Sequence, residues 1–119
     1  MTITVNAKTY NNDVARGNDS FRYLHSTLHT SSHPDYIDLY RTAAPLGDDG
    51  VVKYKGRVKL TRGCTNGTTE LASDIILDVI CSVPSTCAAA EVDAVLADLG
   101  SFIASATFKT TVKNGTINF

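Results

Sequence analysis

Two segments of this chain alternate apolar and polar residues with a period of two, which is the period of a β-strand. The first covers residues 35–43, DYIDLYRTA, and the second covers residues 51–60, VVKYKGRVKL. Between them stands PLGDDG, which is rich in the residues that reverse the direction of a chain. The sequence therefore predicts a long antiparallel hairpin, and a chain that contains it is expected to fold around an antiparallel sheet.

The second of these strands places four cations on one face, here called the basic stripe: Lys53, Lys55, Arg57 and Lys59. The chain as a whole has 11 Lys and Arg against 12 Asp and Glu, so the stripe is a local concentration in a nearly neutral protein. Alternate side chains of a strand stand about 6.6–7 Å apart, close enough to engage successive phosphates of a nucleic acid. An ordinary solvated sheet face explains the stripe as well, so both interpretations stay open.

Further strands are predicted on both sides of this hairpin. The β-prone runs within residues 2–10 indicate an N-terminal hairpin that turns at Asn6-Ala7, followed by a polar connection over residues 11–20. Residues 20–30, rich in Ser, Thr and aromatic residues, predict one or two strands. Residues 71–83, LASDIILDVICSV, predict a third long strand, with an apolar face and a mixed face.

Two helices are predicted after Pro84. Ser85 or Thr86 is the expected N-cap of the first, which runs to about Leu99 with apolar residues at helical spacing. A short second helix is expected around residues 107–113, with Gly115 as its stop.

Strands first and helices last indicate an α+β fold, and 119 residues suit a single domain. The sheet is expected in residues 1–83 and the helical tail in residues 85–119. If the helices cover one face of the sheet, the other face is the place to seek function. The stripe would lie on that open face, and the covered face of the same strand would carry its apolar residues, Val52, Tyr54, Val58 and Leu60.

The cysteines and histidines favour neither a disulfide framework nor a metal site. Three cysteines without CxxC or CxxH spacing, Cys64, Cys81 and Cys87, leave at least one thiol free or paired between chains. Three histidines recur every four residues, at His25, His29 and His33, but residues four apart on a strand are separated by about 13 Å. They are therefore expected to be surface histidines, and no metal or cofactor is predicted.

No sequence motif of catalysis is present, so the chain is not expected to be an enzyme. The remaining enzyme hypothesis is a Cys87 thiol with a distant histidine, whose geometry the sequence does not fix. The N-terminus, MTITVNAKTY, lacks the pattern of a secretory signal, and no apolar run approaches the length that crosses a bilayer. These features predict a soluble protein made in the cytoplasm, with no membrane partner.

Over nearly its whole length the chain resembles the coat proteins of single-stranded RNA bacteriophages, the levivirus type. The resemblance is carried by the hairpin of residues 35–60, the loop TRGCTNGTTE, the strand of residues 71–83 and the tail of residues 90–119, which ends in NGTINF. It implies an N-terminal hairpin, a five-stranded antiparallel sheet and two C-terminal helices. It also implies an obligate, intertwined homodimer in which the two sheets form one continuous ten-stranded sheet.

The same resemblance implies a structural function. Dimers would assemble in the bacterial host cytoplasm into the icosahedral capsid of a virion and would package single-stranded genomic RNA against the sheet. The sheet would also bind an RNA hairpin and thereby repress translation. The alternative is a dimeric β-sheet RNA-binding regulator that builds no shell.

Seven residues are implied to bind RNA. Lys53 and Lys55 are the leading candidates, and the others are Arg57, Lys59, Tyr40, Thr42 and Asp78. A carboxylate at position 78 would repel phosphate unless it pairs with a lysine or accepts a hydrogen bond from a base amino group. Cys64 lies in the segment that surrounds the symmetry axes of such shells, and it is the candidate for a disulfide between subunits.

Overall fold

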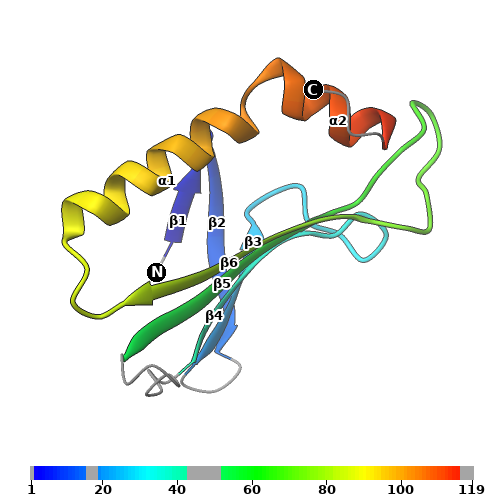
Figure 1. Ribbon diagram of the computed structural model, residues 1–119. Helices are drawn as coiled ribbons and strands as arrows, with labels where there is room; N and C mark the ends of the chain where they lie inside the picture. Colours follow the sequence, from blue (N-terminus) through cyan, green and yellow to red (C-terminus); the bar gives the residue numbers. More distant parts are fainter. Residues whose placement is uncertain (1, 16–18, 43–51, 116–119) are drawn as a thin grey trace. The chain divides into compact units, whose positions relative to one another are not determined.

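The computed structural model describes residues 2–15, 19–42 and 52–115 of the chain. These residues form six strands followed by two helices (Figure 1): β1 (Thr2–Val5), β2 (Lys8–Ala15), β3 (Ser20–His25), β4 (Asp35–Thr42), β5 (Lys53–Arg62), β6 (Ile75–Pro84), α1 (Ala89–Ile103) and α2 (Ala106–Asn114). The chain divides into two compact units, Met1–Ser85 with the strands and Thr86–Phe119 with the helices. The α+β class, the antiparallel sheet and the two C-terminal helices are confirmed.

All six described strands belong to one antiparallel sheet in the order β1-β2-β3-β4-β5-β6. The N-terminal hairpin is thus the first pair of strands of this sheet rather than an addition to a separate five-stranded one. Figure 1 shows that β1 and β2 run at a steep angle to β4, β5 and β6, so the sheet is curled. Each strand is joined to its neighbour in sequence, and the predicted reversal at residues 45–50 lies outside the described residues.

The first hairpin turns at Asn6-Ala7 as predicted. Val5 pairs with Lys8, and the two residues between them have φ angles of 48° and 61°. Positive φ at both central residues is what a type I′ turn requires. The predicted polar connection over residues 11–20 is wrong for its first half, because β2 continues to Ala15 with a bulge between Asn12 and Val14. Polar residues are tolerated there because one side of such a strand faces water.

Residues 20–30 form one strand, β3, and then a loop. The prediction of a surface histidine is wrong for His25, which is only 9% exposed. Its ring meets the Tyr10 ring edge-on with centroids 5.2 Å apart, and its Nδ1 accepts hydrogen bonds from the backbone N–H groups of Thr27 and Leu28. This histidine is buried because the loop that follows it supplies donors for its ring nitrogen.

The buried core lies toward the N-terminal half of the sheet. Tyr10, Tyr23 and Ile37 form its centre, and the half-buried side chains packed against them are Ile3, Phe21, Leu39 and Leu60. A polar triad is buried beside them: the Tyr10 hydroxyl donates to Asp35 at 3.0 Å, and Arg62 donates to Asp35 at 3.2 Å and to the Tyr10 hydroxyl at 2.9 Å. Burial raises the pKa of the Tyr10 hydroxyl. This triad joins β2, β4 and β5 at one end of the sheet.

The β3–β4 and β5–β6 loops are tied to each other at the same end. The backbone N–H of Gly63 donates to the Pro34 carbonyl at 2.7 Å, and the Nδ1 of His33 lies 2.9 Å from a carboxylate oxygen of Glu70. A Cβ at Gly63 would lie 2.7 Å from His33 Nδ1 and 3.1 Å from His33 Cα. Only glycine fits this crossing of the two loops.

The first helix begins later than predicted. Its N-cap is Ala88, which makes no side-chain cap, rather than Ser85 or Thr86. The backbone N–H of Ser85 donates to the Val52 carbonyl at 2.9 Å, so the chain still follows the sheet at that point. The helix also continues through Gly100 to Ile103.

The second helix agrees closely with its prediction. The Ser105 hydroxyl caps its N-terminus by accepting from the Phe108 N–H, and Gly115 ends it in the left-handed conformation at φ 65°. Within the described chain, neither helix has the length and apolar character needed to cross a bilayer.

Candidate nucleic-acid interface

The stripe cations and their predicted neighbours lie on one face of the sheet. Strand register places Lys55 beside Thr42, and Arg57 beside Tyr40, on β4. On the opposite side, β6 brings Asp78 next to Lys59. All seven residues that the sequence singled out for RNA therefore share a face, because the side chains of paired residues in adjacent strands point the same way.

The central stripe residue is held by a carboxylate. Arg57 donates through Nε and Nη2 to the two oxygens of Asp78, both at 2.8 Å. This bidentate pairing holds the pKa of the Asp78 carboxyl below its ordinary value and raises the pKa of Arg57. The guanidinium also lies 5.5 Å from the centre of the Tyr40 ring. Asp78 is therefore paired with a cation, but the partner is Arg57 and not the lysine that the sequence analysis considered.

A second group that consists of an arginine, an aspartate and a tyrosine lies on β3 and β4. Arg22 on β3 donates through Nε and Nη2 to Asp38, at 2.7 and 3.0 Å, and stacks 3.9 Å from the centre of the Tyr36 ring. The Tyr40 hydroxyl donates to Asp38 at 3.3 Å and so links the two units. Sequence reasoning missed Arg22 and Asp38 because their pairing joins strands whose register the sequence does not reveal.

Because of these pairings, the two ends of the basic stripe differ in the charges that surround their cations. Arg57 is paired with Asp78, and Lys59 lies between Asp38 on β4 and Asp78 on β6, so this end is compensated by carboxylates. Lys55 lies between Thr42 and Ser82, which carry no charge. The other end, formed by Lys53 and Lys55, is here called the positive end of the stripe, because the neighbours that strand register places beside Lys55 are uncharged.

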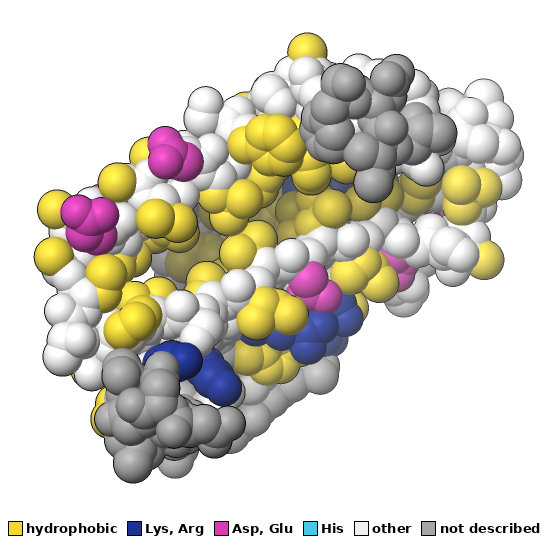
Figure 2. Space-filling model, in the orientation of Figure 1, with side chains coloured by type: hydrophobic (Ala, Val, Ile, Leu, Met, Phe, Trp, Pro, Cys, Tyr) yellow, Lys and Arg dark blue, Asp and Glu magenta, His cyan; other side chains and the backbone are white. Residues whose placement is uncertain are grey.

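A shallow hollow of about 470 Å³, here called the stripe hollow, opens beside this positive end. It is lined by side chains from three strands, among them Tyr40, Thr42, Lys55, Arg57, Ile80 and Ser82. Ile80 is 78% exposed and adds an apolar surface that the sequence did not single out. Figure 2 shows Lys and Arg side chains gathered along the lower side of the sheet in this view, with carboxylate and apolar side chains among them. Cations, hydroxyls, an aromatic ring and an apolar side chain are the groups that bind unpaired nucleotides.

Arg62, the cysteines and the histidines do not belong to this set of seven residues. Arg62, at the end of β5, belongs to the buried triad and not to the stripe face. Cys64 is half-buried and its thiol lies 3.7 Å from the Thr65 carbonyl, and Cys81 and Cys87 are also free thiols in the single chain. The three described histidines bond to the backbone or to Glu70, and no group of three potential metal ligands exists among the described residues.

The opposite face of β5 and β6 is apolar and exposed in the single chain. Tyr54 is 59% exposed and Val58 41%, and the apolar β6 side chains Ile75 and Leu77 are exposed as well. Within the described sheet, β6 has only β5 as a neighbour, so one of its edges is open. The helices also expose apolar side chains, namely Val95, Leu96, Leu99, Phe102, Ile103 and Val112. Such surfaces are typical of chains that associate.

Several solved structures of virus-like particles share this fold. The chain matches a subunit of the virus-like particle of bacteriophage AVE019 with a TM-score of 0.74 and 16% identity, over 100% of this chain and 96% of that one. It matches the virus-like particle of Beihai levi-like virus 32 with a TM-score of 0.71 and 17% identity, over 93% and 83% of the two chains. For the virus-like particle of bacteriophage ESE020 the values are 0.66 and 20%, over 97% and 92%.

Comparisons of the sequence itself find nothing. No family model matches the chain, and no curated protein does. The likeness therefore lies in the fold, which the chain shares over nearly the full length of these particle subunits.

Proposed function

We propose that this chain is the coat protein of a single-stranded RNA bacteriophage, a structural protein rather than an enzyme. It dimerises, assembles into an icosahedral capsid in the cytoplasm of a bacterial host, and packages the genomic RNA against the stripe face. The observation that carries the proposal is the combination of a particle-subunit fold over the whole chain with a sheet face that gathers cations beside an open hollow. The fold by itself does not distinguish a capsid subunit from a subunit of another assembly. The charged face is therefore a necessary part of the argument for a coat protein that packages RNA.

Dimerisation accounts for the apolar surfaces of the single chain. The open edge of β6 supplies unpaired backbone donors and acceptors over ten residues, enough to join two sheets into one. The exposed apolar face of β5 and β6 and the apolar side chains of α1 are then covered in the dimer, since large exposed apolar patches are rare on monomers. The two-fold arrangement places two copies of the stripe on one continuous face.

RNA binding follows from the positive end of the stripe. Lys53 and Lys55 contact phosphates, and the unpaired bases of an RNA hairpin stack and bond within the stripe hollow beside Tyr40, Thr42 and Ser82. A hairpin bound in this way at a translation start would block the ribosome, which is the proposed repressor activity. The compensated end, with Arg57, Lys59 and Asp78, extends this surface, and there the Asp78 carboxylate restrains Arg57.

Electron microscopy of the protein expressed alone in bacteria tests the proposal. Uniform closed shells that contain nuclease-protected RNA are the expected result. Free dimers that bind RNA would contradict the capsid assignment and favour the alternative function, a non-capsid RNA-binding regulator. Particles or dimers without RNA in the presence of excess cellular RNA would contradict the RNA-binding part of the proposal.

A further inference from the structure

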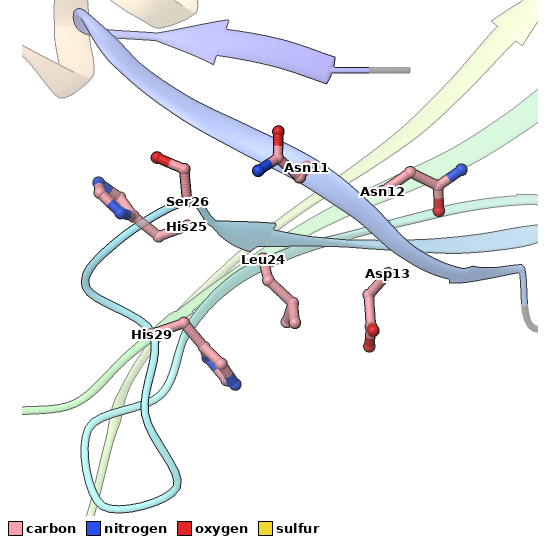
Figure 3. Close-up of a pocket in the computed structure, with 7 residues that line it drawn as sticks. All are labelled: Asn11, Asn12, Asp13, Leu24, His25, Ser26 and His29. Atoms are coloured by element: carbon pink, nitrogen blue, oxygen red, sulfur yellow. The ribbon is translucent and has the colours of Figure 1, made fainter.

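A second hollow lies away from the stripe, between β2, β3 and the loop that follows β3 (Figure 3), and is here called the hairpin hollow. Its volume is about 290 Å³, close to the lower limit of roughly 300 Å³ for small-ligand pockets. The residues that form it include Asn11, Asn12, Asp13, Leu24, Ser26 and His29. Nothing in the stripe proposal uses these residues.

Three of these side chains form a set of complementary groups. Figure 3 shows Leu24, Asp13 and His29 pointing to the same side of β2 and β3, into one space. The His29 Nδ1 accepts a hydrogen bond from the Asp35 N–H at 3.1 Å, so the neutral ring carries its proton on Nε2. The hollow thus offers a ring N–H donor, a carboxylate acceptor and an apolar surface.

This set fits a nucleobase better than a phosphate. Among the described residues, no Lys or Arg lines the hollow, and the Asp13 carboxylate would repel a phosphate group. Every nucleobase presents hydrogen-bond donors and acceptors side by side on its Watson–Crick edge, together with an apolar face. An acceptor and a donor beside an apolar side chain match that pattern.

The location connects the hollow to the RNA-binding face. Leu24 pairs with Tyr36, which lies on the same face as Asp38 and Tyr40, so the hollow opens on the stripe side of the sheet. The stacked Arg22 and Tyr36 lie between the two hollows. The separation is two strand spacings across the sheet and four residues along it, or roughly 17 Å by ideal strand geometry, a span of a few nucleotides.

We propose that the hairpin hollow is a second nucleobase site, which takes an unpaired base of the same RNA strand that the stripe holds. Asp13 accepts from the base, the His29 Nε2–H donates to it, and Leu24 packs against its ring. Arg22, which is paired with Asp38 and stacked on Tyr36, lies between the two sites. This inference rests on the proposed RNA binding and names a place on the protein where that RNA would continue.

Photo-crosslinking of protein to RNA that carries 4-thiouridine at unpaired positions tests the inference, with mass spectrometry of the linked peptides. We expect links to residues 11–13 or 24–29 in addition to links to the β5 peptide. Links to β5 alone would overturn the second site while leaving the proposed function intact. An absence of any link from bound or packaged RNA would overturn both.

An affinity measurement tests the role of Asp13, with Asp19→Ala as a control that removes the same charge from an exposed ion pair with Arg41. We expect Asp13→Ala to bind the RNA about 10–100-fold more weakly than Asp19→Ala, the size of one lost hydrogen bond to a charged group. With an abasic nucleotide at the linked position, the two variants should bind equally. Equal affinities for the intact RNA, or a difference that persists with the abasic RNA, would contradict a base contact at Asp13.

Discussion

Strand β5 carries two arginines that each pair with an aspartate, but the two pairs differ in burial. Arg62 bonds to Asp35, whose side chain is 2% exposed, within the triad that Tyr10 completes. Arg57 bonds to Asp78, and these side chains are 43% and 32% exposed. A buried carboxylate without its partners is costly, whereas an exposed pair contributes little to stability and stays available to a ligand. The same residue types therefore serve the fold at one end of the strand and the proposed RNA interface at the other.

The largest effect that separates the two regions is expected from Asp35→Ala. It removes the acceptor of both the Tyr10 hydroxyl and Arg62, so the buried hydroxyl has no acceptor and Arg62 keeps only its bond to that hydroxyl. We expect the free energy of unfolding to fall by about 3 kcal/mol, as when one partner of a buried pair is removed. Denaturant titration at fixed protein concentration measures it.

The control for this substitution is Asp19→Ala, because the side chains of Asp19 and Arg41 are 58% and 72% exposed. That variant should lose about 0.5 kcal/mol or less, since exposed ion pairs contribute little. Similar losses in the two variants would mean that burial does not distinguish the pairs.

A smaller loss is expected from Gly63→Ala at the buried end. The added Cβ would collide with His33, including its Cα at 3.1 Å, and would separate the β3–β4 and β5–β6 loops. Overpacking of this kind costs about 2 kcal/mol. The matched change near the stripe is Gly56→Ala, where the nearest atom is the Tyr40 carbonyl oxygen at 3.4 Å and the added methyl can be accommodated. Thermal unfolding should separate the two variants, and equal melting temperatures would contradict the tight crossing at Gly63.

Asp78→Asn should act on RNA rather than on stability. Loss of the carboxylate charge frees Arg57 for phosphate, so the affinity for RNA should rise and the slope of log K against log salt should steepen by about 0.7. The melting temperature should change little, because the pair is exposed. The control is Asp98→Asn on α1, which makes the same charge change outside the sheet. Weaker RNA binding by Asp78→Asn would mean that the carboxylate contacts the RNA more than it restrains Arg57.

The strands that could be predicted from the sequence are those with one face of apolar residues and one face of polar residues. In β4 and β5 the period of two is visible because apolar and polar residues separate cleanly, and the stripe face followed from it directly. Asn11 and Asn12 in β2 carry no such signal, and their strand is formed by pairing with β3, a partner distant enough in sequence to leave no local trace. His25 was misjudged for a related reason, since its burial depends on the Tyr10 ring and on two loop amides.

Prediction of the candidate site is limited in the same way, because it also depends on which strand residues lie side by side. Sequence spacing placed the four stripe cations together, but it gave them equal weight. Only strand register reveals that Arg57 and Lys59 lie next to carboxylates while Lys55 lies next to Thr42 and Ser82. The Arg22–Asp38 unit and the exposed Ile80 could not be found without that register.

The central claim is that the positive end of the stripe binds RNA, and the salt dependence of RNA affinity for Lys53→Ala/Lys55→Ala tests it most directly. Loss of two phosphate contacts should weaken binding and lower the slope of log K against log salt by about 1.4, with the dimer still folded. The matched control, Lys109→Ala/Lys113→Ala on α2, removes two lysines outside the sheet and should keep the wild-type slope. An unchanged affinity and slope in the stripe variant, or an equal change in the control, would contradict the assignment of this face to RNA.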